Sequence, residues 1–187
     1  MASAFQISDL LLGDLQTNKK GSKTLPVSDA SKPIVWTPEP QTIPFEPKSF
    51  SGETRVNLVM RASPSVIEAL TAFDEQIVQA CFADSLRIFG KALTLEEVRL
   101  RYTPCLKISD KGYEPTWTAK ISISEPTVKC WNADKTPCAL PDSWTRRKVQ
   151  PRIVFRCLWF MPTAFGCLCE CTDALLSESE TKAKCPF

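Results

Sequence analysis

Histidine is absent from the 187-residue chain. Without it, nucleophilic mechanisms that pair Ser or Cys with His are excluded, as is every metal site that contains His. Most acid–base catalysis near neutral pH also relies on histidine. The chain carries no glycine-rich phosphate loop of the GxxxxGK[ST] or GxGxxG type. We therefore expect a protein that is not an enzyme, has no catalytic residues and uses no cofactor.

Long apolar runs are also missing, because no stretch reaches the length that a transmembrane helix needs. The first residues carry Asp9 and Asp14 and no cation ahead of their apolar stretch, which argues against a secretory signal or a transit peptide. The nine cysteines are accordingly interpreted as reduced thiols of an intracellular protein that has no membrane partner.

Glycine is scarce and proline abundant, with six glycines against fifteen prolines. Proline is disfavoured in helices and central strands, so we expect many of the prolines in linkers, turns and edge segments such as residues 34–50. The formal net charge is +2, yet residues 101–160 hold eleven Lys and Arg against five Asp and Glu. A basic central segment in a nearly neutral chain favours a polyanionic partner, although solvated strand faces have similar charges.

Periodicity predicts mostly strands. Alternation predicts strands at 55–61 and 116–123, with further strands at 106–108, 128–131, 152–160 and 165–174. One long helix is expected from Ser63 to Gly90, with Ser63 as its cap and Pro64 at its first position. A second, short helix is expected from Thr94, with Glu97 completing a capping box.

This order of elements indicates a mainly β (α+β) fold, an OB-like five-stranded barrel with one long helix packed against it. The domain is expected to span residues 34–174. Residues 1–33 are polar and rich in helix breakers, residues 175–187 are polar, and we expect both segments to be flexible.

Three cysteines alternate at Cys167, Cys169 and Cys171. Zinc sites prefer gaps of two to four residues at a tight turn, whereas this spacing places three sulfurs in a row on one strand face. We interpret the three as small side chains facing a crowded core, and we expect no metal site.

The densest cluster of charge is Arg146, Arg147 and Lys148, with Lys129, Arg152 and Arg156 on strands close by. Such a triplet is either a solvated loop or a phosphate contact at a barrel rim, and the sequence leaves both open.

Four tryptophans remain to be assigned either to the core or to the candidate site. Trp131 lies beside Lys129 on a polar strand face, which suits either a stacking platform or a cover over the barrel end. Trp159 groups by alternation with Ile153, Phe155 and Cys157 and resembles a core residue, although Pro162 soon ends the strand and places Trp159 near the rim. Trp117 is expected in the core with Ile121 and Ile123. Trp144 is expected to be exposed next to the basic triplet.

Three segments resemble the OB-fold single-stranded DNA-binding proteins of short-tailed lytic phages and nucleocytoplasmic large DNA viruses. They are Gly112-Tyr113-Glu114-Pro115-Thr116-Trp117-Thr118-Ala119-Lys120-Ile121, Phe155-Arg156-Cys157-Leu158-Trp159-Phe160, and the pair Phe165-Gly166. The resemblance covers about residues 34–174. The chain departs from the phage proteins in its C-terminal tail, where Glu178 and Glu180 alternate with Lys182 and Lys184 instead of forming a strongly acidic segment.

The resemblance implies single-stranded DNA binding in replication, recombination or repair, in the nucleus or at a cytoplasmic viral replication site. It implies base stacking on Trp159 and Phe160, and phosphate contacts by Lys120, Arg146, Arg147, Lys148 and Arg156. With Trp131, Trp144 and Lys129, these residues are the predicted nucleic-acid site. The sequence leaves open whether the protein prefers DNA or RNA, whether it forms a homodimer and whether it binds replication proteins. The alternative function is a β-barrel protein-interaction or structural module that binds no nucleic acid.

Overall fold

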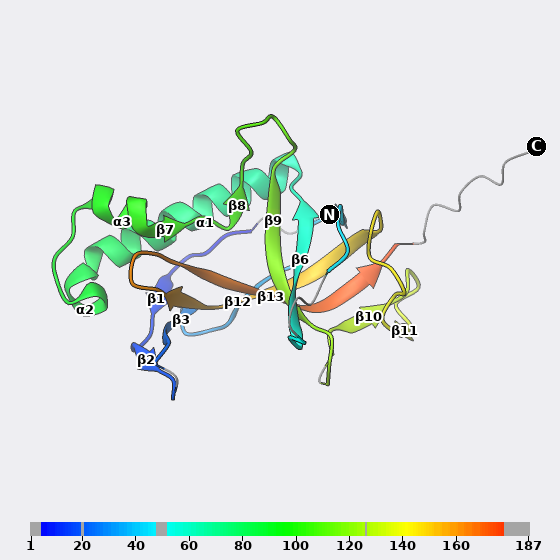
Figure 1. The fold of residues 1–187 in the computed structure, drawn as a ribbon, viewed down its shortest axis with the longest axis horizontal. Helices are drawn as coiled ribbons and strands as arrows, with labels where there is room; N and C mark the ends of the chain where they lie inside the picture. The colour runs from blue at the N-terminus through cyan, green and yellow to red at the C-terminus, as the bar shows by residue number, and fades with distance from the viewer. Residues whose placement is uncertain (1–4, 20, 48–51, 126, 178–187) are drawn as a thin grey trace, which may run out of the picture.

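Two long strands near the end of the chain form the centre of the fold (Figure 1). In this computed structural model, which describes residues 5–19, 21–47, 52–125 and 127–177, β12 (Lys148–Phe160) and β13 (Phe165–Leu176) pair antiparallel over most of their length. Alternating buried and open positions along both strands give each one a core face and an outer face. Most other strands join the sheet through β12 or β13.

The remaining strands are short apart from three of seven residues each. In chain order they are β1 (Leu10–Leu12), β2 (Gln16–Thr17), β3 (Lys23–Asp29), β4 (Ile34–Trp36), β5 (Gln41–Thr42), β6 (Arg55–Arg61), β7 (Tyr102–Thr103), β8 (Leu106–Lys107), β9 (Thr116–Ser122), β10 (Lys129–Trp131) and β11 (Pro137–Cys138). On one edge of β12 lie β3, β4 and β5, all antiparallel to it. On the far edge of β13 lie β7, β9 and β10, all parallel to it, and β6 pairs antiparallel with β9.

Three helices connect β6 to β7 and cover one side of the sheet (Figure 1): α1 (Pro64–Ala83), α2 (Ser85–Phe89) and α3 (Leu95–Arg101). The predicted caps are confirmed. Ser63 accepts a hydrogen bond from the Val66 amide at 3.4 Å, and Thr94 and Glu97 form the capping box. Gly90 ends α2 in the left-handed conformation, at φ 72°. No helix in the described part of the chain is long and apolar enough to cross a membrane.

Aromatic rings fill the space between α1 and the core face of the sheet. Phe73 of α1 contacts Phe155 of β12 at a centroid distance of 4.4 Å, and Phe5 lies 4.8 Å from Trp36 and 5.3 Å from Phe155. The prediction that Trp117 belongs to the core is confirmed, since its side chain is fully buried. Ile123, predicted beside it, is 39% exposed because β9 ends one residue earlier, at Ser122.

The mainly β class is confirmed, but the strands do not form a closed version of the expected five-stranded barrel. The sheet is open and mixed, and among the described residues no strand ladder joins β6 to β4 or β5. The difference follows from β13, whose length lets it pair in parallel with three separate strands, β7, β9 and β10, along one edge. Such pairings between segments distant in sequence leave no local pattern to read.

The single long helix expected over 63–90 is also wrong. The chain leaves the helical conformation at Asp84, which carries φ −113° and ψ 24°. A tertiary contact accompanies the break, because the Ser85 hydroxyl is buried and accepts a hydrogen bond from the Leu93 amide at 3.2 Å. Aspartate is a weak helix former in a helix interior, which makes this position the easiest place for the turn.

The N-terminal segment, expected to be flexible over 1–33, contains β1, β2 and β3. β3 pairs with β12 and buries Leu25 and Val27 in the shared core. The flanking polar residues hid this short alternation, and Pro26 is tolerated in the strand because it interrupts only one position of the ladder. Most of the C-terminal segment, residues 178–187, lies outside the described residues, while β13 continues to Leu176. The proposed domain limits stay a prediction.

Candidate functional site

The outer face of β12 carries an unusual row of side chains. Its core face holds buried Val149, Ile153, Phe155 and Leu158. The intervening positions place Lys148, Arg152 and Arg156 on the outer face, all three exposed. Because they are four residues apart, these cations follow one another at intervals of about 13 Å along the strand. The row ends at Trp159, near the turn between β12 and β13.

A β-bulge decides which way Trp159 points. Phe155 pairs with Cys169 and Cys157 pairs with Leu168, so Arg156 is an extra residue in β12. Beyond the bulge the alternation is reversed: Leu158 is fully buried, and Cys157 and Trp159 therefore face outward. The grouping of Trp159 and Cys157 with Ile153 and Phe155 as core residues is wrong, because strict alternation assumes an unbroken ladder.

The Trp159 indole lies directly over Gly166, its partner residue in β13. A Cβ atom added to Gly166 would lie 2.7 Å from Trp159 Cζ2 and 3.0 Å from the Thr103 carbonyl oxygen, so only glycine fits under the ring. The indole is half-buried by this contact. A ring held flat against a sheet by the residue beneath it is a rigid surface on which a planar ligand can stack.

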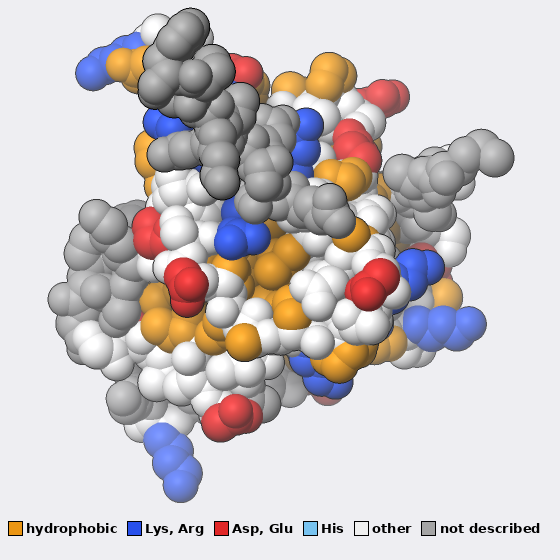
Figure 2. Space-filling model, turned by 90° about the vertical axis from the view of Figure 1, so that its right-hand side faces the viewer, with side chains coloured by type: hydrophobic (Ala, Val, Ile, Leu, Met, Phe, Trp, Pro, Cys, Tyr) orange, Lys and Arg blue, Asp and Glu red, His pale blue; other side chains and the backbone are white. Residues whose placement is uncertain are grey.

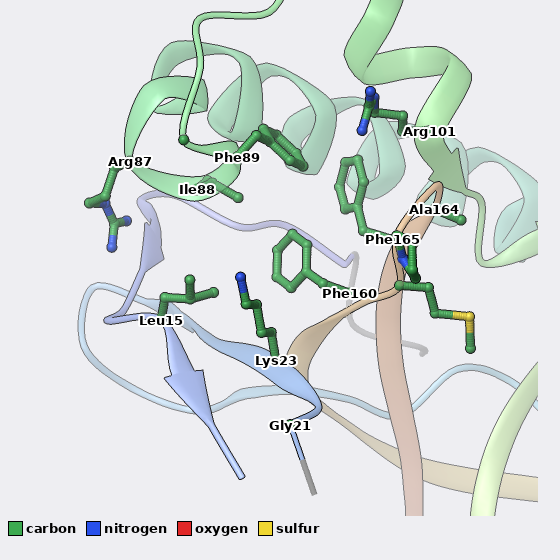
Figure 3. Close-up of a pocket in the computed structure, with 13 residues that line it drawn as sticks. Leu15, Gly21, Lys23, Arg87, Ile88, Phe89, Arg101, Phe160, Ala164 and Phe165 are labelled. Carbon is green, nitrogen blue, oxygen red and sulfur yellow. The ribbon is translucent and has the colours of Figure 1, made fainter.

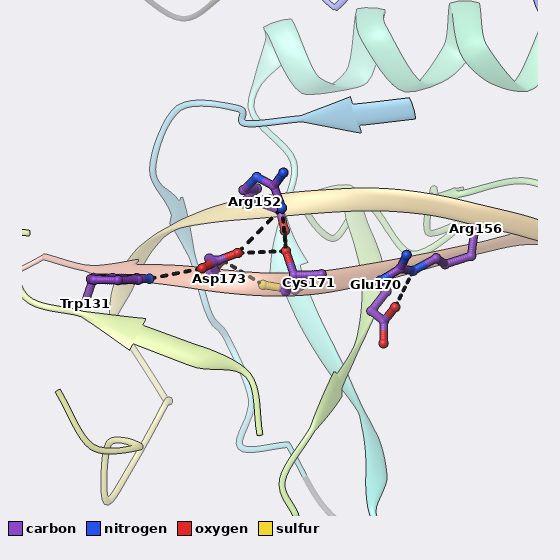
Figure 4. Close-up of polar contacts among 7 residues, drawn as sticks. Trp131, Arg152, Arg156, Glu170, Cys171 and Asp173 are labelled. Carbon is purple, nitrogen blue, oxygen red and sulfur yellow. Dashed lines mark hydrogen bonds and ion pairs between the residues drawn. The ribbon is translucent and has the colours of Figure 1, made fainter. Parts of the chain in front are cut away.

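Carboxylates on β13 hold the cations of the outer face in place (Figure 4). Arg156 Nε lies 2.5 Å from Glu170 Oε2, and Arg55 Nη2 of β6 lies 3.0 Å from Glu170 Oε1. Arg152 Nη1 lies 3.6 Å from Asp173 Oδ2. Exposed ion pairs of this kind contribute only about 0–1 kcal/mol to stability. Their clearer effect is to fix the directions in which the guanidinium groups point.

Next to this row, the outer faces of β6 and β9 continue the same surface. In the sheet, Lys120 of β9 is the strand partner of Glu170 in β13 and of Asn57 in β6. The Lys120 side chain forms no ion pair among the described residues. Above Asn57, Val59 and Lys120 lies a hollow of about 580 Å³, walled by residues 44–46 and Thr145. This hollow extends the outer surface away from β12, with Lys120 beside Glu46 and Glu53 in its lining.

Phe45 stands between that hollow and a second one of about 330 Å³. The second hollow contains Arg61, Lys107 and Tyr113. Phe45 and Tyr113 are 63% and 71% exposed, which is high for aromatic side chains without a structural role. We call the two hollows together the Phe45 groove. Of the groove residues, sequence reasoning named Lys120 as a site candidate and missed Phe45, Arg61 and Tyr113.

The basic triplet lies at the opposite end of β12 from Trp159. Arg146 adopts φ 65°, and Arg147 donates from Nε to the Ser143 carbonyl oxygen at 2.7 Å. Glu46 anchors this loop, because one of its carboxylate oxygens accepts hydrogen bonds from Ser143, Trp144 and Thr145. Burial opposes ionisation of Glu46, but these hydrogen bonds outweigh it and lower its pKa. Arg146 and Lys148 stay exposed.

The other two predicted tryptophans differ in accessibility. Trp144 is 4% exposed, so the expectation that it is an exposed aromatic is wrong: the loop anchored by Glu46 turns it into the core. Trp131 is half-buried, and its indole N–H donates to Asp173 at 3.2 Å (Figure 4). Lys129 is exposed on β10, two residues from Trp131. On the end of the molecule shown in Figure 2, basic and acidic side chains are interspersed around an apolar area rather than gathered by sign.

Phe160 does not share a face with Trp159. It stacks on Phe165 at a centroid distance of 5.6 Å and an interplanar angle of 13°, on the opposite side of the β12–β13 hairpin. The structure thus brings Trp159, Lys120, Arg152 and Arg156 onto one surface, places Arg146, Arg147 and Lys148 at its far end, and separates Phe160 and Trp144 from it. None of these positions tests a binding role, which stays a prediction.

Buried ionisable groups lie elsewhere, between α1 and the sheet. Burial raises the pKa of Asp74, whose carboxylate accepts hydrogen bonds from the Tyr102 hydroxyl at 2.6 Å and the Cys105 amide. Burial also raises the pKa of the Cys171 thiol to about 12, which keeps it protonated and a poor metal ligand. Among the described residues, no group of three or more Cys, Asp or Glu side chains is arranged to hold a metal ion.

Comparison with known proteins places the fold. No protein-family model and no curated protein matches the sequence. A C-terminally truncated single-stranded DNA-binding protein from bacteriophage Enc34 matches with a TM-score of 0.51 and 10% identity, over 89% of this chain and 96% of that chain. A second structure of the Enc34 protein matches with a TM-score of 0.47 and 10% identity, over 89% of each chain. The chain therefore has a fold similar to that of a phage single-stranded DNA-binding protein.

Proposed function

We propose that this protein binds single-stranded DNA along the outer face of β12, β13, β9 and β6. The observation that carries the proposal is the convergence on this one face of a rigidly seated indole, Trp159, with the cations Lys120, Arg152 and Arg156. The fold supports it, because the similar Enc34 protein is by its name a single-stranded DNA-binding protein.

The proposed mechanism combines two kinds of contact, to phosphates and to bases, that do not depend on the DNA sequence. Arginine and lysine side chains displace counterions from phosphates, which makes affinity fall with salt. Aromatic rings stack on bases, each contributing about 1–3 kcal/mol. A strand that follows β12 meets cations along the strand and reaches Trp159 at its end, while the Phe45 groove provides a second aromatic position beside Lys120.

The carboxylates on this face shape the interaction. Glu170 holds both Arg55 and Arg156, so a bound phosphate competes with it for the same guanidinium groups. Such competition lowers affinity at each site, but the ion pairs also fix the directions of the arginines before the strand arrives. A single-stranded DNA-binding protein that must release its strand to enzymes benefits from moderate affinity.

In the cell, we propose that the protein acts as a non-enzymatic partner of DNA replication, recombination or repair. Its location would then be intracellular, in the nucleus or at a cytoplasmic viral replication site. Binding to RNA, to replication proteins or to a second copy of the chain belongs to the same proposal and needs separate tests.

Fluorescence titration with oligo-dT at salt concentrations between about 50 and 200 mM tests the proposal. We expect quenching of tryptophan emission and an affinity that falls steeply with salt. Trp159→Leu is expected to weaken binding by about tenfold, from the loss of one stacked base. Lys120→Gln and Arg156→Gln are each expected to reduce the salt slope by about 1.

Lys135→Gln provides a matched control, because Lys135 is exposed in the turn between β10 and β11, away from the proposed face. It should leave both affinity and salt slope unchanged. If the wild-type protein binds no oligonucleotide at low salt, or if Lys135→Gln and Arg156→Gln weaken binding equally, the proposal is wrong. The protein-interaction alternative would then gain weight.

A further inference from the structure

A cavity of about 520 Å³ lies on the opposite side of the β12–β13 hairpin from Trp159 (Figure 3). Its walls come from four separate regions of the chain. They are the segment around β2 and β3, α2 with the glycine that ends it, the C-terminal end of α3, and the tip of the β12–β13 hairpin. Its volume lies within the range of about 300–1,000 Å³ that is typical of small-molecule sites.

The cavity contains an ordered group of rings. Phe160 and Phe165 are stacked, and Phe89 meets them edge-on at centroid distances of 6.0 Å and 5.4 Å. Phe165 is buried, whereas Phe160 and Phe89 are only half-buried. Part of the surface of these two rings is therefore free to contact a planar ligand.

Charge in the cavity has one sign only. The lining residues include the cations Lys23, Arg87 and Arg101 and no Asp or Glu. Figure 3 shows the Lys23 amine beside the Phe160 ring and the Arg101 guanidinium above Phe165. This differs from the Phe45 groove, whose lining includes Glu46, Glu53 and Glu114.

The three cations are not equivalent. Arg87 has structural partners, because it pairs with Asp84 and donates to the Gly13 carbonyl oxygen at 2.8 Å. Lys23 and Arg101 form no ion pair within the described ranges, although Glu97 one helical turn away interacts with Arg101 at longer range. Two cations without ion-pair partners thus flank free aromatic surface in an acid-free cavity.

We propose that this cavity binds one nucleoside phosphate, with the base against Phe160 and Phe89 and the phosphate at Arg101, while Lys23 supplies a second cation on the other side of the rings. An aromatic anion satisfies both features at once, whereas an apolar ligand leaves the cations unused and inorganic phosphate leaves the rings unused. The ligand has two sources of the same chemistry: a free mononucleotide, or the terminal nucleotide of a strand that turns over the hairpin tip from Trp159. Only the second source rests on the proposed function.

Titration of the full chain with thymidine monophosphate, followed by NMR broadening of the nucleotide ring signals, tests the cavity itself, and inorganic phosphate is assayed by its competition with the nucleotide. We expect thymidine monophosphate to bind, with thymidine and inorganic phosphate each binding at least about tenfold more weakly. Phe160→Leu and Arg101→Gln should each weaken binding about tenfold. Lys91→Gln removes a neighbouring exposed charge outside the cavity and should have no effect.

Oligo-dT with a 5′-phosphate, a 3′-phosphate or neither separates the two sources. If the strand end is the ligand, one terminal phosphate strengthens binding, and Arg101→Gln removes that gain while Trp159→Leu does not. If the free nucleotide is the ligand, thymidine monophosphate binds and terminal phosphates make no difference.

Absence of thymidine monophosphate binding together with no effect of either terminal phosphate would overturn the proposal. Nucleotide binding that is insensitive to both Phe160→Leu and Arg101→Gln would also overturn it. Either result leaves binding along the outer face intact, so failure of the cavity is distinguishable from failure of the proposed function. Because Arg101→Gln removes no buried ring, it remains interpretable even if Phe160→Leu lowers stability.

Discussion

The two faces of β12 differ in what their side chains do, although they belong to one strand. On the core face, Phe155 packs against Phe73 and Phe5, and Leu158 is fully buried. On the outer face, Arg152 and Arg156 are exposed and held by surface ion pairs, and Arg152 also donates a hydrogen bond to the Thr172 hydroxyl. In the proposed function, neighbouring residues serve stability and ligand contact separately, so substitutions on one face should affect one property with little effect on the other.

Phe155→Ala should have the largest effect on stability. Removing a large ring from the core costs about 3–5 kcal/mol, from lost burial and the cavity left behind. Urea denaturation should show the midpoint fall, while the affinity of the remaining folded protein for oligo-dT stays within about twofold, because the ring does not reach the outer face. A large loss of affinity at full folding would break the separation between the two faces.

Gly166→Ala should affect both faces. The added methyl group would meet Trp159 Cζ2 at 2.7 Å, so either the indole or the backbone must move. Overpacking of this kind costs about 1–3 kcal/mol, and displacement of the ring should also weaken oligo-dT binding. Thermal unfolding and fluorescence titration measure the two effects. If stability falls while binding is unchanged, the seated indole is not part of the interface.

Glu170→Gln should strengthen binding. Removing the carboxylate frees Arg55 and Arg156 to pair with phosphates and deletes a like-charge repulsion toward the strand. Stability should change by at most about 1 kcal/mol, since both ion pairs are exposed. Titration at two salt concentrations should show a higher affinity and a steeper salt dependence. An unchanged affinity would mean that the strand does not contact these arginines.

Asp74→Asn contrasts the exposed carboxylate of Glu170 with a buried one. Burial raises the folded-state pKa of Asp74 above its ordinary value of 3.8, so the folded protein binds its proton more tightly than the unfolded chain does. The wild type should therefore lose stability, relative to Asp74→Asn, as the pH rises from 3.8 through the raised pKa, with no further change above it. Denaturant midpoints of both proteins across this range measure the difference. A constant difference would show that the folded-state pKa is not raised.

Local patterns predicted local structure well. The strand at 55–61, the strand expected at 116–123 up to Ser122, the Ser63 and Thr94 caps and the stop at Gly90 all appear. Each depends on interactions within a few residues, such as a side chain capping an amide or a strand burying every second position. The sheet as a whole did not follow, because the parallel pairings of β13 join segments far apart in sequence.

Sequence by itself determined the residue types that a site can use: no histidine, a basic central segment, and strands that alternate apolar with cationic residues. Only the tertiary structure decided which of them meet. The bulge at Arg156 turned Trp159 outward, the anchoring of a loop by Glu46 turned Trp144 inward, and the hairpin sent Phe160 to the opposite side. A one-residue shift in a ladder exchanges the two faces of a strand, and that shift depends on pairing partners that no local pattern contains.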